Sequence, residues 1–131
     1  MSKFSDELLK DVLNWQTKRY LQITSAIDST QRLIDLSKIN DEDSLELEID
    51  LRQVSIDELQ TLDNVFEEMT VDFSENDVDE LLSIEYDEEN ISVLENKLRL
   101  ANFNSYSALN KLKGIDKIFS TEYGKNLSIY V

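Results

Sequence analysis

The most constraining feature of this sequence is a long helical pattern near its N-terminus. Within residues 6–38, apolar or neutral residues recur every three or four positions, and neither Gly nor Pro interrupts the segment. This periodicity places the recurring residues on one face of an α-helix. Ser5 followed by Asp6 and Glu7 is typical of a helix start. The sequence therefore predicts a helix of about 32 residues, which at 1.5 Å per residue is about 48 Å long.

A helix of this length needs a partner for its apolar stripe. Either shorter helices of the same chain pack against it, or a second copy of the helix pairs with it in a coiled coil and makes a homodimer. Gln16 and Thr30 lie within the stripe, where polar residues can set the register of such a pairing, although a simple bundle accommodates them equally well. The sequence leaves both alternatives open.

Residues 45–51 change the period, because apolar and acidic side chains alternate strictly there. Alternation is strand periodicity, and residues 126–131 are the only other convincing extended candidate, so we expect a minor two-stranded β element. Leu and Glu are weak strand formers, which keeps a helix over 45–51 as the alternative. Ser55 and Glu58 have the spacing of a capping box, so the next helix is expected over about 56–70.

The rest of the chain continues the helical pattern. Ser74 is a candidate cap for a short helix that ends near Leu82, and a further helix is expected from Ile91. Residues 102–105 are expected to break this helix, which then continues to a C-cap at Gly114. The predicted fold class is mainly α, a small helical bundle built on the long N-terminal helix. The whole chain, residues 1–131, is expected to form one acidic helical domain.

Composition excludes most catalytic chemistry. The chain has no Cys and no His, and therefore lacks the usual nucleophilic thiol, general base and transition-metal ligands. Its Asp and Glu clusters lack the alternating spacing and the Gly of a calcium loop. We expect no catalytic residue, no cofactor and no metal site. The N-terminus has no signal-peptide pattern and no apolar run is long enough to span a membrane, so a cytoplasmic protein is expected.

The net charge of −15 is concentrated in the middle of the chain. Residues 41–96 contain 21 Asp and Glu residues and a single basic residue, Arg52, whereas residues 1–40 and 97–131 both carry a small positive excess. Such a segment repels nucleic acid, whose binding depends on Lys and Arg, so direct binding to DNA or RNA is not expected. The basic residues after position 96 are expected to face the acidic middle and reduce its self-repulsion.

Carboxylates three or four positions apart on a helix lie about 5 to 6 Å apart, close to the spacing of successive phosphates. The sequence therefore suggests an inhibitor that mimics nucleic acid and occupies the basic nucleic-acid-binding surface of a partner protein. In size and composition it resembles phage anti-defence proteins and the immunity proteins of nuclease toxins. The predicted partner-binding residues are Glu67, Glu68, Asp72, Glu75, Asp77, Asp79, Glu80, Glu85, Asp87, Glu88 and Glu89.

Two other interpretations fit the same sequence. The acidic residues could be only the solvated faces of an acidic protein. Alternatively, the protein could be a secretion or assembly chaperone whose apolar surface binds a helix of a client. Exposed aromatic residues such as Trp15 and Tyr20 would support the chaperone, although core positions are expected for both.

Overall fold

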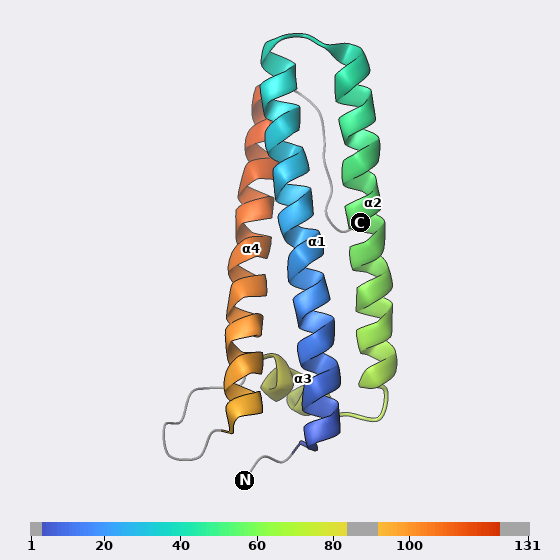
Figure 1. Ribbon diagram of the computed structural model, residues 1–131, viewed down its shortest axis with the longest axis vertical. Helices are drawn as coiled ribbons and strands as arrows, with labels where there is room; N and C mark the ends of the chain where they lie inside the picture. The colour runs from blue at the N-terminus through green and yellow to red at the C-terminus, as the bar shows by residue number, and fades with distance from the viewer. Residues whose placement is uncertain (1–3, 84–91, 124–131) are drawn as a thin grey trace.

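The computed structural model describes residues 4–83 and 92–123, which form a bundle of three long helices and one short helix (Figure 1). The helices are α1 (Asp6–Lys38), α2 (Glu42–Met69), α3 (Glu75–Leu82) and α4 (Val93–Tyr123). α1 packs against both α2 and α4, and it runs antiparallel to α2 and parallel to α4. The mainly helical bundle expected from the sequence is confirmed.

α1 has the boundaries that the sequence predicts. Ser5 lies in an extended conformation at its start, and its hydroxyl oxygen accepts a hydrogen bond from the Leu8 amide at 3.2 Å. The two acidic residues that follow lie at the positive end of the helix dipole. After Lys38, Asn40 adopts a left-handed φ of 54°, which Asn tolerates better than most residues. This short turn sends α2 back along α1.

The predicted strand over residues 45–51 is wrong, because this segment belongs to the N-terminal half of α2. Leu and Glu are good helix formers, and Asp41 caps the helix by accepting a hydrogen bond from the Ser44 amide at 3.2 Å. Among the described residues no strand is present, and the predicted pairing segment, residues 126–131, lies outside them.

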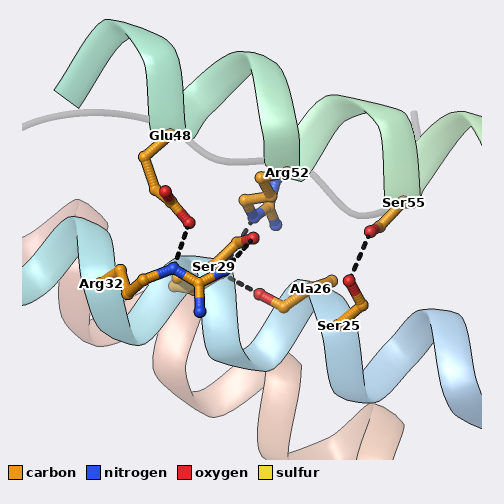
Figure 2. Close-up of polar contacts among 8 residues, drawn as sticks. Ser25, Ala26, Ser29, Arg32, Glu48, Arg52 and Ser55 are labelled. Atoms are coloured by element: carbon orange, nitrogen blue, oxygen red, sulfur yellow. Dashed lines mark hydrogen bonds and ion pairs between the residues drawn. The ribbon is translucent and has the colours of Figure 1, made fainter. Parts of the chain in front are cut away.

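The predicted helix start at Ser55 is also wrong. Ser55 lies in the middle of α2, is buried against α1, and its hydroxyl forms a 3.0 Å hydrogen bond with that of Ser25 (Figure 2). A Ser followed by Glu three residues later has the same spacing in a cap and in a helix interior. In α2 the Ser55 hydroxyl forms a hydrogen bond between two helices and does not cap a helix end.

The predicted break at residues 102–105 is absent, and α4 is continuous. Asn102 and Ser105 are buried inside the bundle. Gln16 Nε2 donates to Asn102 Oδ1 at 2.8 Å, so the polar side chain that looks like a helix breaker instead has a buried partner. Gly114 is not a C-cap either, since it lies inside α4 with open space where a Cβ would point.

The core consists of three apolar clusters along the bundle axis. α3 closes the end of the bundle where α1 begins, because its Leu81 packs in the same cluster as Trp15 and Leu98. The middle cluster contains Ile23, Ala26, Ile27, Ile56, Leu59, Ala108 and Leu112. The third contains Leu33, Ile34, Leu45 and Phe119. The apolar stripe of α1 is thus packed against α2 and α4 of its own chain, and a homodimer through α1 stays a prediction.

Buried polar residues interrupt the apolar core. The Gln16–Asn102 pair forms one such layer. A second polar layer lies two heptads further along α1 and α4, at Thr30 and Asp116. There Arg52 of α2 donates from Nη2 to Asp116 Oδ2 at 2.6 Å and from Nε to Thr30 Oγ1 at 3.0 Å. Both charged side chains of this ion pair are almost inaccessible to solvent, at 3% for Arg52 and 6% for Asp116.

Candidate protein-binding surface

The predicted acidic residues that the structure describes lie at the end of the bundle closed by α3. Glu67 and Glu68 are in the last turn of α2, Asp72 is in the turn after it, and the others are on α3. All are exposed except Asp77, which is half-buried. The remaining predicted residues, Glu85, Asp87, Glu88 and Glu89, lie outside the described residues.

The short helix α3 holds its carboxylates in a fixed arrangement. The Ser74 hydroxyl caps α3 by accepting a hydrogen bond from the Asp77 amide at 3.2 Å, and Leu81 anchors the helix in the core. Glu75 and Asp79 are one turn apart on the solvent side. Glu80, which follows Asp79 directly, is exposed about 100° further around the helix, so the three carboxylates do not form one straight line.

Sequence reasoning missed an acidic surface along α2. Ten of the 28 residues of α2 are Asp or Glu. Five exposed members follow one side of the helix at near-helical spacing, and we call them the acidic row: Asp43, Glu46, Asp50, Asp57 and Glu68. The strand prediction concealed them, because a strand over 45–51 would have put its acids and its leucines on opposite faces. The excess of acidic residues over residues 41–96 was the sequence feature that could have indicated the acidic row.

α2 itself contributes no exposed basic side chain beside the acidic row. The only basic residue of α2 is Arg52, and it is buried with Asp116. Glu48, which is also buried, forms a 2.6 Å ion pair with Arg32 of α1, and Figure 2 shows both Glu48 and Arg52 pointing toward α1. The charge on the outer side of α2 is therefore entirely negative.

The lysines of α4 are exposed, namely Lys97, Lys111, Lys113 and Lys117, whereas Arg99 is half-buried. Within residues 4–83 and 92–123, no ion pair joins a lysine of α4 to an acidic residue of α2. The outer side of α4 also exposes Phe103 and Tyr106. The acidic and basic sides of the bundle are thus on different helices.

Next to the acidic row, α2 exposes a second set of apolar side chains. Leu47, Leu51, Val54 and Val65 are 62%, 50%, 67% and 41% exposed, and we call them the apolar row. Their spacing of four, three and eleven residues keeps them on one side of the helix, with Glu58 and Thr61 completing the pattern. α2 therefore has two apolar faces, one packed in the core and one in contact with solvent.

The apolar row leads into a groove between α1 and α2. This groove has a volume of about 430 Å³, and its lining residues are Asp11, Asn14, Trp15, Lys18, Glu58, Thr61, Leu62, Val65 and Met69. Val65 belongs to both the apolar row and the groove, and Glu58 and Thr61 connect them. Leu21, three residues after Lys18 on α1, is 60% exposed.

Trp15 gives the groove a rigid wall. Its indole Nε1 donates to the Leu62 carbonyl oxygen at 2.6 Å, and its ring stacks on Phe66 with centroids 4.3 Å apart. The Arg19 guanidinium lies 5.6 Å from the Trp15 ring centroid. Trp15 is buried, as expected from the sequence, whereas Tyr20 is 36% exposed.

Burial raises the pKa of two carboxyl groups, Asp63 of α2 and Asp116 in the interior of the bundle. The pKa of Asp63 is raised by burial, with the charge of Arg19, 3.7 Å away, opposing the shift and that of Glu67 adding to it. Burial likewise raises the pKa of Asp116, opposed by the charge and hydrogen bond of Arg52 and by the nearby Thr30 hydroxyl. The pKa of Arg52 is lowered by burial, and its ion pair with Asp116 counteracts this.

We expect the protein to become more stable on mild acidification. A carboxyl group whose pKa is higher in the folded state binds a proton more readily there than in the unfolded chain. Its contribution to stability therefore increases as the pH falls through the raised pKa of the folded state toward the ordinary value near 4, and it is lost as the pH rises. Protonation also reduces repulsion among the many exposed carboxylates. Thermal unfolding at matched ionic strength should give a higher Tm at pH 5 than at pH 7.5.

The variant Asp63→Asn checks the contribution of Asp63. It removes one titrating group and keeps the size of the side chain, so the rise of Tm with falling pH should become smaller. The control is Asp28→Asn, which removes an exposed carboxylate whose side chain lies on the other side of α1. Equal pH dependence of both variants and the parent would contradict the assignment to Asp63.

Within the described residues, no group of three or more Asp and Glu side chains is arranged to hold a metal ion. None of the helices there combines the length and apolar character required to cross a membrane. The acidic row, the apolar row and the groove all use α2, whereas a second pocket, which includes Tyr20, Asp28 and Lys111, lies between α1 and α4.

No protein-family model, no curated protein and no solved structure matches this chain.

Proposed function

We propose that this protein is a non-enzymatic binding protein that recognises a basic protein through the acidic surface of α2 and α3. In its most specific form, the proposal is an inhibitor that occupies the nucleic-acid-binding surface of its partner and competes there with DNA or RNA. Association would be accelerated by long-range attraction and slowed by salt.

The observation that carries the proposal is the one-sided charge of α2. Its ten carboxylates share the helix with one cation, and that cation is buried and paired with Asp116. A protein that only needed solubility could intersperse both signs of charge on this surface. Rigid helices also keep the carboxylates at fixed distances, as recognition of a defined basic surface requires.

A chaperone that binds a client helix is the second candidate, and the apolar row supports it. Four exposed aliphatic residues on one side of a helix suit the apolar face of another helix better than a row of phosphate-binding cations. The inhibitor and the chaperone would both bind another protein, through a basic surface or an amphipathic helix respectively. They differ in whether nucleic acid competes for that partner.

Neutralising three carboxylates of α3 tests the proposal. The variant combines Glu75→Gln, Asp79→Asn and Glu80→Gln, which preserves side-chain size. The partner is captured from host lysate at low ionic strength and identified by mass spectrometry, and its association rate is then measured by surface plasmon resonance. We expect association about threefold to tenfold slower than for the parent, with a weaker dependence on salt. Unfolding free energy should stay within about 0.5 kcal/mol.

The matched control removes three charges of the opposite sign, through Lys111→Gln, Lys113→Gln and Lys117→Gln on α4. This control should not slow association. An inhibitor of the nucleic-acid-binding surface must also be displaced by excess DNA or RNA. Partner binding that nucleic acid does not displace would reject the inhibitor and leave the chaperone. Equal association rates for the parent and the acidic variant would reject recognition through α3.

A further inference from the structure

The apolar row and the α1–α2 groove together make one elongated surface. From Leu47 to Val65 the row covers about 27 Å of α2 at 1.5 Å per residue. Its end enters the groove, where Val65 and Trp15 line opposite walls. A soluble helix usually exposes isolated apolar residues, whereas Leu47, Leu51 and Val54 lie together within about two turns, and such a cluster indicates a surface used for binding. Glu58 and Thr61 lie between this cluster and Val65.

The acidic row lies beside the apolar row, and four of its five members lie between Asp43 and Asp57. Glu46 and Asp50 directly precede Leu47 and Leu51 in the sequence, so each carboxylate lies about 100° around the helix from its apolar neighbour. At the Val65 end, Trp15 and the other groove residues of α1 flank the apolar row on the opposite side. In cross-section, this end of the surface has a wall from α1, a floor from α2 that includes Leu62, Val65 and Met69, and an acidic edge.

We propose that this surface docks an amphipathic α-helix of the partner, with its apolar side on the apolar row and Lys or Arg residues along the edge that meets the acidic row. This rests on the proposed function, since it names the part of the basic partner that is bound. A helix in such a groove presents apolar residues at positions i, i+3 or i+4, and i+7, which match the spacing of the apolar row. Long Lys and Arg side chains cover apolar surface with their methylene groups and place their charges at the edge.

The groove supplies the most enclosed part of this surface. At about 430 Å³ it has room for a large apolar side chain of the bound helix beside Trp15 and Met69. Trp15 is held by its hydrogen bond to Leu62 and by stacking on Phe66, so it needs no rearrangement to form the wall. Binding energy in such interfaces is usually concentrated in one anchor of this kind, with the surrounding contacts excluding water.

A synthetic peptide tests the proposal directly. The probe is a fluorescein-labelled peptide of Leu, Lys and Ala, about 18 residues long to match the apolar row, with Leu on one helical face and Lys beside it. Two further peptides have the same composition in a scrambled, non-amphipathic order, or Glu in place of Lys. Anisotropy gives the affinities. The emission of Trp15, the only Trp in the chain, reports contact at the groove.

The parent should bind the amphipathic Lys peptide at least about tenfold more tightly than the scrambled or the Glu peptide, with a shift in Trp15 emission. Leu51→Gln combined with Val54→Gln should weaken binding about tenfold, because two apolar contacts are lost. Glu46→Gln combined with Asp50→Asn should weaken it about threefold at low salt and less at high salt. The matched control, Phe103→Gln combined with Tyr106→Gln on α4, should bind like the parent. All six positions are exposed, so folding should be retained.

Poly-lysine separates failure of this inference from failure of the proposed function, because it carries the charge without an apolar face. The helix docking alone would be overturned if two results were found together. Poly-lysine would bind through the carboxylates, and the Leu51/Val54 variant would bind the amphipathic peptide as tightly as the parent. The helix docking alone would also be overturned if the scrambled peptide bound as well as the amphipathic one, or if Trp15 emission did not change. Absence of binding to both poly-lysine and the peptide at low salt would overturn the docking and the proposed function together.

Discussion

Replacing Arg52 with Met is expected to lower the free energy of unfolding by about 3 to 5 kcal/mol, the usual cost of leaving one partner of a buried ion pair alone. Without Arg52, the Asp116 carboxylate stays in a site where its side chain is 6% exposed, and the Thr30 hydroxyl is its remaining hydrogen-bond partner among the described residues. Urea unfolding followed by circular dichroism measures the loss. Because burial raises the pKa of Asp116, the variant should recover stability as the pH falls and the carboxyl group becomes protonated.

Two further variants make this expectation specific. Lys113→Met removes the same charge from an exposed position on α4 and should change stability by no more than about 0.5 kcal/mol. Arg52→Met combined with Asp116→Leu removes both buried charges and should recover most of the loss, since well-packed apolar residues often replace a buried ion pair without cost. Equal stability of the Arg52 and Lys113 variants would show that the buried pair does not contribute in this way.

Replacing Ile23 and Ile27 together with Asp should unfold the protein. Ile23 is fully buried and Ile27 nearly so, and both pack in the central cluster between α1, α2 and α4. Two carboxyl groups there would have to be buried without partners, and the combined cost of at least about 5 kcal/mol is comparable to the whole stability of an ordinary domain. Loss of the helical circular-dichroism signal is the measurement.

The matched control for these core substitutions is Leu21→Asp. Leu21 lies on the same helix but is 60% exposed, so the chemically similar change should leave the protein folded. The experiment also bears on self-association, because sedimentation at several concentrations gives the mass of each folded sample. A folded Ile23/Ile27 variant would show that the stripe of α1 is not part of the core.

The fold was predictable from sequence where most apolar residues of a helix lie on one face. α1 has this property, and its boundaries follow from Ser5 and from the turn after Lys38. α2 does not, since Leu45 faces the core while Leu47 and Leu51 face solvent. Two apolar faces on one helix produce local alternation, which is why residues 45–51 resembled a strand.

Residues 102–105 show a second limit. Asn and Ser have low intrinsic preference for helix interiors. Inside the bundle, however, Asn102 accepts a hydrogen bond from Gln16 and donates one to the Leu81 carbonyl oxygen. Those partners come from α1 and α3, which lie far away in the sequence. No local pattern contains that information.

For the candidate surface, the sequence supplied the sign and the region of the charge but not its arrangement. The count over residues 41–96 located the acidic segment, and the structure places part of it on α3 as expected. The acidic row could not be found while residues 45–51 were treated as a strand. The α1–α2 groove requires Trp15 and Val65 to meet across two helices, and this depends on how α1 and α2 pack.

The order in which these helices meet has a consequence for how the chain folds. α1 and α2 are joined by a short turn, so contacts near it, such as Arg32 with Glu48, join residues only 16 positions apart. The contacts of α1 with α4, such as Gln16 with Asn102, join residues 86 positions apart. Small loops close at lower entropic cost, and we expect the α1–α2 hairpin to form before α4 docks. Asp116 arrives with α4, so in the hairpin alone Arg52 keeps its contact with water. Its guanidinium is dehydrated only in the step that brings its counter-ion.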